Sequence, residues 1–197
     1  MKIWITAGMA LASVAAMANS FTVATFADPS GNSSNPVIYV DVNAFIIYGG
    51  WNQPGLTLET PGLIGGGSVS NAQFTMSTTS LTPIISGVYA MGSGTINFTD
   101  SFLNPVLNIA YNKGLVVMDG GAGSSDLRLD GVTFSGPNVP AGLSQEMYNF
   151  SFANGFDNGL FVHSYTASFT SSAVPEPASM IALGAGLLAL ARRRRRA

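Results

Sequence analysis

The sequence predicts an all-β fold, an antiparallel β-sandwich of jelly-roll type with roughly nine to eleven strands. Three observations support this fold class. Apolar and polar residues alternate with a period of two in one segment after another, Gly, Asn, Ser and Thr fill the connections, and Lys and Glu, which favour helices, are scarce. We expect this body to span residues 19–170.

The first predicted strands are Phe21 to Thr25 and the β-branched and aromatic run from Val37 to Tyr48. In residues 72–78 and 95–99 apolar side chains occupy alternate positions, which is typical of half-buried strands. Further strands are predicted at 106–111, 115–118, 132–135, 147–152 and 160–170. Asn158-Gly159 is a tight-turn signal that would join the last two strands as a hairpin.

The alternatives to this fold are a β-solenoid and extensive disorder. A β-solenoid needs a motif repeated at a fixed period, and the sequence contains none. Extensive disorder is opposed by the regular aromatic alternation, so we expect it only at residues 28–35 and in a spacer over residues 171–177.

The N-terminus has the pattern of a secretory signal peptide. Lys2 precedes an apolar stretch, and Ala16 and Ala18 form a small-x-small triplet that predicts cleavage after Ala18. We expect residues 1–18 to form a signal helix that is handled by the Sec translocon. A buried N-terminal helix is the alternative interpretation.

The C-terminus combines two prolines, an apolar segment and a block of cations. Residues 178–191 carry no charge, and as a helix they would extend about 21 Å, short of the roughly 30 Å hydrocarbon core. Five arginines follow: Arg192, Arg193, Arg194, Arg195 and Arg196. Because arginines beside an apolar segment stay cytoplasmic, we expect a short transmembrane helix, a cytoplasmic tail at 192–197 and an external body. A core helix with a basic end is the alternative.

Val174, Pro175, Glu176 and Pro177, together with the apolar segment and the arginine run, resemble the PEP-CTERM sorting domain of Gram-negative bacteria. The resemblance implies recognition by an exosortase, an integral-membrane cysteine protease or transpeptidase. It also implies transient anchoring in the inner membrane, then a place at the cell surface or in the extracellular matrix, in association with exopolysaccharide and biofilm. It covers about 23 of the 197 residues and implies nothing about the fold or activity of the body.

Without its two ends the chain is acidic. Residues 19–174 keep only Lys113 and Arg128 as cations against nine Asp and Glu, a net charge near −7. A surface of this sign repels polyphosphate, so nucleic acid is not expected as a partner. The chain has no cysteine, which excludes disulfides and thiolate chemistry.

The residues that could support catalysis form no familiar pattern. His163 is the single histidine and lies in a predicted strand, so we expect neither a two-His metal site nor a relay between two histidines. A carboxylate pair for glycoside hydrolysis would have to come from Glu59, Asp100, Asp119 and Glu146, and sequence alone places no two of them face to face.

Two segments have a composition that suits a ligand. The turn at 119–130 holds three carboxylates that Ca²⁺ would accept, but it lacks the spacing of a calcium loop; an acidic turn without metal is the alternative, and we expect no cofactor. Trp51 and Tyr48 would suit an aromatic platform for a sugar ring, whereas a lone Trp beside a strand more often closes the end of a core.

The sequence therefore predicts an exported, non-enzymatic cell-surface or extracellular-matrix protein that is processed through its C-terminal anchor. A carbohydrate-binding module with Trp51 and Tyr48 on its binding face is the second hypothesis. A hydrolase that uses paired acids is the third.

Overall fold

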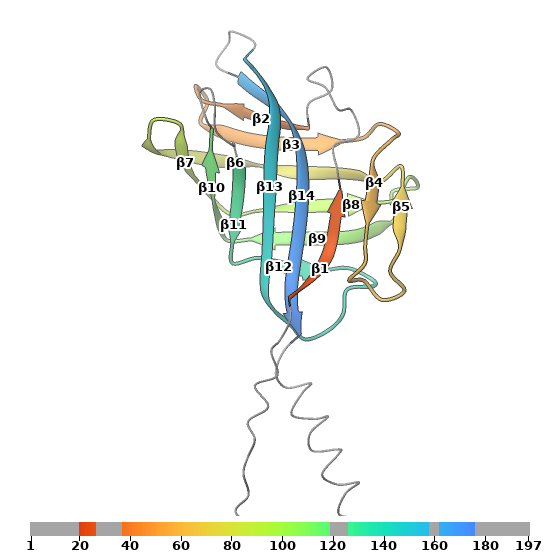
Figure 1. The fold of residues 1–197 in the computed structure, drawn as a ribbon. Helices are drawn as coiled ribbons and strands as arrows, with labels where there is room; N and C mark the ends of the chain where they lie inside the picture. Colours follow the sequence, from red (N-terminus) through yellow and green to blue (C-terminus); the bar gives the residue numbers. More distant parts are fainter. Residues whose placement is uncertain (1–19, 27–36, 119–125, 158–161, 176–197) are drawn as a thin grey trace, which may run out of the picture.

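The computed structural model describes residues 20–26, 37–118, 126–157 and 162–175. They form fourteen antiparallel strands, and no helix occurs among them (Figure 1). The strands are β1 (Phe21–Phe26), β2 (Ile38–Asp41), β3 (Ile46–Trp51), β4 (Thr57–Glu59), β5 (Ser68–Ser70), β6 (Gln73–Ile85), β7 (Val88–Met91), β8 (Gly94–Thr99), β9 (Pro105–Tyr111), β10 (Lys113–Val117), β11 (Asp126–Asp130), β12 (Thr133–Ser135), β13 (Leu143–Asp157) and β14 (Val162–Pro175). The predicted helices at 1–18 and 178–191 lie outside the described residues.

Eight of these strands close into a ring. Starting from β6, each pairs antiparallel with the next in the order β6, β7, β10, β11, β13, β14, β2, β3, and β3 returns to β6. Two three-stranded extensions leave the ring: β8, β9 and β12 continue from β6, while β1, β4 and β5 continue from β14. The result is one continuous sheet whose end strands are β12 and β5.

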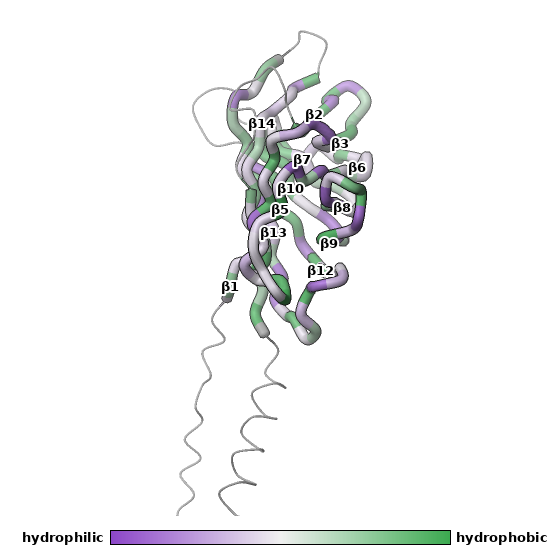
Figure 2. The backbone as a smooth tube through the Cα atoms, turned by 90° about the vertical axis from the view of Figure 1, so that its right-hand side faces the viewer, coloured by the Kyte–Doolittle hydropathy of each residue, from purple (hydrophilic) through white to green (hydrophobic). Residues whose placement is uncertain are grey.

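The sheet folds over itself into two layers. In Figure 1, β13 and β14 run from top to bottom, and β3, β6, β8 and β9 run across the view behind them. The side view of Figure 2 places β1, β13 and β14 on one side and β6, β8, β9 and β12 on the other. The enclosed space holds the core.

Phenylalanines from both layers meet at the centre of this core. Phe26 of β1 and Phe169 of β14 lie with ring centroids 4.8 Å apart, and Phe98 of β8 stacks on Phe169 at 5.0 Å. Phe74 of β6 and Phe150 of β13 complete the cluster, and all five rings are at most 2 % exposed. Aromatic contacts between layers hold the two halves of the sheet together.

The all-β, antiparallel class is confirmed, but the jelly-roll sandwich is not the arrangement that forms. A sandwich has two separate sheets, whereas here β6 and β14 each change partner along their length and so connect the layers. β13 bends at two bulges, where its register against β14 shifts and where Gln145 and Asn154 have positive φ. Alternation within one strand contains no information about such changes of partner.

The run Val37 to Tyr48, predicted as one strand, is a hairpin. Asp41 accepts hydrogen bonds from the backbone N–H groups of Asn43 (2.9 Å) and Ala44 (2.7 Å), which closes a turn between β2 and β3. The other predicted strands are present with shifted ends, and β4, β5, β7 and β11 were not predicted.

Candidate functional site: the sorting junction

The end of β14 is where the folded body meets the predicted C-terminal signal. Phe21 lies opposite Ala173, so the first and last strands are neighbours and the described chain begins and ends at the same end of the body (Figure 1). On the other side of β14, Ser144 lies opposite Val174 and Leu143 opposite Pro175. β14 is therefore paired on both flanks almost to its last residue.

The predicted spacer over 171–177 is part of this strand up to Pro175. Ser171 and Ala173 are fully buried, and Val174 is 8 % exposed. The Ser144 hydroxyl donates a hydrogen bond to the Val174 carbonyl at 3.2 Å. Residues 171–175 thus belong to the sheet, and the body predicted to end at residue 170 continues to Pro175.

Pro175 is the last residue of β14 that the structure describes. Proline has no backbone N–H, so Pro175 cannot donate a ladder hydrogen bond to a neighbouring strand. Among the described residues, the pairing of β14 with β13 extends to the pair Leu143–Pro175.

The last strand of the all-β body thus contains the first residues of the segment whose sequence resembles a C-terminal sorting signal. A family model of the PEP-CTERM protein-sorting motif matches residues 173–196, which confirms the resemblance seen in the sequence. No curated protein and no solved structure matches the chain. The motif implies export, sorting through a membrane anchor in Gram-negative bacteria, and processing by an exosortase, a membrane protease.

The structure describes only two of the predicted signal residues. Val174 and Pro175 end β14. The others lie outside the described residues, namely Ala16, Ala18, Glu176, Pro177, Arg192, Arg193, Arg194, Arg195 and Arg196. Within the part of the chain that is described, no helix is long and apolar enough to span a membrane.

The structure separates the two aromatic residues predicted to contact a glycan. Trp51 at the end of β3 is 7 % exposed and belongs to the core, and its indole Nε1 has no hydrogen-bond partner. Tyr48 is half-buried and stacks on Tyr39 of β2, with ring centroids 5.1 Å apart and planes 7° apart. Burial, then the neighbouring Tyr48, raises the pKa of the Tyr39 hydroxyl. Tyr39 was missed in the sequence because the run from Val37 to Tyr48 was predicted as one strand, and only the hairpin places Tyr39 opposite Tyr48.

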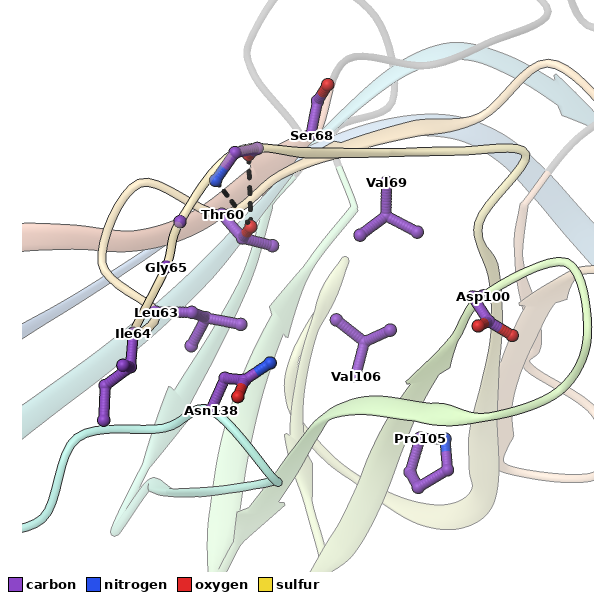
Figure 3. A pocket seen from close by; sticks show the side chains of 12 residues that line it. Thr60, Leu63, Ile64, Gly65, Ser68, Val69, Asp100, Pro105, Val106 and Asn138 are labelled. Carbon is purple, nitrogen blue, oxygen red and sulfur yellow. Dashed lines mark hydrogen bonds between the residues drawn. The ribbon is translucent and has the colours of Figure 1, made fainter.

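A shallow groove of about 400 Å³ lies between β5 and the start of β9 (Figure 3). Its walls include Thr60, the loop Leu63 to Gly67, Asp100 and Asn138. The Thr60 hydroxyl donates to the Gly67 carbonyl at 3.1 Å, which fixes the glycine loop against the end of β4. The lining holds one carboxylate and no aromatic ring, so it offers no acid pair.

That carboxylate, Asp100, is already satisfied. It accepts the N–H of Phe102 at 2.8 Å, the N–H of Asn104 at 2.9 Å and the Asn104 side-chain amide at 2.8 Å. The Asn104 side-chain hydrogen bond is the main cause of the lowered pKa of Asp100. Asp100 therefore shapes the β8–β9 turn.

Three further acids of the described chain, Glu146, Asp126 and Asp130, have structural partners. The Glu146 carboxylate accepts the backbone N–H of Phe134, and burial raises its pKa while this hydrogen bond lowers it. In the acidic turn at 119–130, whose first part is outside the described residues, Asp126 pairs with Arg128 at 2.8 Å. Asp130 pairs with Lys113 at 3.0 Å.

The described residues contain no cluster of three His, Asp or Glu side chains that would hold a metal ion. Asp119 lies outside them, and Glu59 is on β4. His163 is a residue of β14, opposite Val40 and Asp157, as the strand interpretation expected. The sorting junction is thus the best-defined candidate site of the described chain.

Proposed function

We propose that this chain is an exported, non-enzymatic protein of the cell surface or extracellular matrix. Its β-rich body is translocated, held in the inner membrane through the C-terminal segment, cut by an exosortase near Pro175, and then released or attached outside the cell. The observation that supports the proposal is the sorting motif at residues 173–196, which continues directly from the last strand of the body.

The acidic character of the body fits this destination. With a net charge near −7 over residues 19–174, copies of the body repel one another, which favours a soluble extracellular form once the anchor is removed. The core is held by packed aromatic rings without any cysteine, so folding needs no oxidant outside the cell.

The proposal is tested in the native host by comparing a wild-type strain with a strain that lacks its exosortase. We expect the extracellular protein from the wild type to lack residues 178–197 by intact-mass analysis, and the full precursor to accumulate in the membrane fraction of the mutant. An extracellular form that retains residues 178–197 would contradict the proposal.

A second candidate function, glycan binding, is supported by three aromatic residues in a row of paired positions that crosses four strands. Phe156 of β13 lies opposite Ser164 of β14, Ser164 lies opposite Tyr39 of β2, and Tyr39 lies opposite Tyr48 of β3. Because residues directly opposite in an antiparallel ladder share a face, these three rings lie on one side of the sheet. Phe156 is 54 % exposed.

Affinity for the exopolysaccharide of the native host tests this second function. We expect the double variant Y39A/Y48A to lose retention in affinity electrophoresis, because aromatic rings provide the contact surface for sugar rings. The variant Trp51→Phe, which alters a core residue, is the matched control and should bind as the wild type does. Equal retention of all three proteins would remove the basis for this function.

A further inference from the structure

The sorting motif begins inside the last strand of the fold. The match starts at Ala173, whereas β14 continues to Pro175, so the first three matched residues are strand residues. We infer that the sheet shields the chain through Val174, so that processing cuts C-terminal to Pro175 at a rate limited by the opening of the last residue pairs of β14. This inference rests on the proposed function and adds to it the position and the control of the cut.

Both edges of β14 are occupied close to the junction. Ala173 lies opposite Phe21 of β1, and Val174 lies opposite Ser144 of β13. The Ser144 hydroxyl adds a side-chain hydrogen bond to the Val174 carbonyl at 3.2 Å. The backbone on both sides of Ala173 is therefore held within the body.

Burial of the side chains opposes exposure of the same residues. Ala173 is fully buried and Val174 is 8 % exposed, so pulling them out of the sheet would expose apolar surface as well as break the ladder. Two residues upstream, Ser171 is anchored by two hydrogen bonds to Ala24. Fraying is therefore expected to stop before Ser171.

Proteases that act on a polypeptide commonly bind it as an extended segment with free backbone groups on both sides of the cut. A cut before Val174 would need several residues of β14 to leave both β1 and β13. Of the described pairs, a cut after Pro175 needs only the last two, Ser144–Val174 and Leu143–Pro175, to open. Local opening of a strand end is far less costly than opening of a core strand, so the second position is favoured.

The inference is tested in the full-length chain in its native host with an insertion of Gly-Ser-Gly-Ser between Ala173 and Val174. This insertion leaves the sequence from Val174 to Ala197 intact but moves it away from Ser144 and Leu143. Pulse-chase labelling measures the conversion of precursor to mature protein, and intact mass gives the C-terminus of the mature form.

The same four residues inserted between Ile85 and Ser86, in the exposed turn between β6 and β7, provide the matched control. This insertion tests whether a longer chain alone changes export or folding. A Ser144→Ala variant, which removes one hydrogen bond at the junction, gives an intermediate case.

We expect the junction insertion to be processed about five to ten times faster than the wild type, Ser144→Ala slightly faster, and the turn insertion at the wild-type rate. The mature wild-type protein should end at Pro175 or later. Equal rates for the two insertions, or a mature wild-type chain that ends before Pro175, would overturn the inference while leaving the proposed function intact. Absence of cleavage in every variant would instead contradict the proposed function, and the inference with it.

Discussion

The side chain of Ser171 makes a double hydrogen bond to the backbone of Ala24. Its hydroxyl accepts the Ala24 N–H and donates to the Ala24 carbonyl, both at 2.9 Å, and the serine is fully buried. The pair sits where the register of β1 against β14 shifts between Thr22 and Ala24. The hydroxyl thus satisfies backbone groups of β1 at a position where the ladder is irregular.

Ser171→Ala should therefore lower the free energy of unfolding by about 1–3 kcal/mol, because a buried N–H and a buried carbonyl each lose a partner. Urea unfolding of the mature protein, followed by tryptophan fluorescence, measures the change. Ser172→Ala, at the half-buried neighbouring position, is the control and should stay within about 0.5 kcal/mol of the wild type. Similar losses in the two variants would argue against a special role for Ser171.

Gly62 provides a second test, because it marks a close approach of two backbones. A Cβ atom at Gly62 would lie 2.6 Å from the Thr22 carbonyl oxygen and 2.7 Å from the Val23 Cα, whereas a Cβ at Gly67 would meet nothing within 4 Å. We expect Gly62→Ala to destabilise the protein by about 1–3 kcal/mol and Gly67→Ala to have little effect. Thermal unfolding of both variants decides the matter, and a fully stable Gly62→Ala variant would contradict the close packing of β1 against this loop.

The aromatic core predicts that two phenylalanine substitutions will differ greatly in how much they lower the free energy of unfolding. Phe150 is fully buried among the rings of both layers, while Phe102 is 83 % exposed in the β8–β9 turn. Phe150→Ala should cost about 3–5 kcal/mol through the cavity it leaves, and Phe102→Ala less than about 0.5 kcal/mol. Denaturant midpoints of the two variants give the comparison. A loss below about 1 kcal/mol for Phe150→Ala would contradict the packed interior.

Glu146 should make stability depend on pH. Burial raises the pKa of its carboxyl above the ordinary value of 4.5, so the folded protein binds this proton more tightly than the unfolded chain. The stabilisation from the proton is complete below pH 4.5 and is lost as the pH rises through the raised pKa. Relative to Glu146→Gln, whose amide oxygen can still accept the Phe134 N–H, the wild type should lose stability as the pH increases. Unfolding curves at a series of pH values test this, and a difference that does not change with pH would count against it.

The local elements of the fold were predictable because they depend on alternation within short segments. Strands such as β8 and β9 pack one apolar side against the core and leave one polar side, and Figure 2 shows this mixture of hydropathy along their length. β4 and β5 are three residues long, too short for a periodic signal. The closure of the ring was not predictable, since it depends on β6 and β14 exchanging partners at positions that no local pattern marks.

The residues of the candidate site could be recognised in the sequence, but their pairing within the sheet could not. Val174 and Pro175 were recognised from the motif, yet the sequence predicted a disordered spacer over residues 171–177, of which residues 171–175 belong to β14. The spacer's first residues pair with β1 and β13, segments about 150 and 30 positions away in the sequence, and such long-range partners leave no local trace. Trp51 illustrates the same limit, because a Trp beside a glycine turn has the same sequence signature in a core as on a surface.

The neighbouring positions of Phe21 and Ala173 also make the body a natural candidate for circular permutation. A short linker from Pro175 to Ser20 would join the old ends. New ends could be made in the β6–β7 turn, where Ile84 and Ile85 are exposed. In such a rearranged chain the tail would leave from a different corner of the same fold.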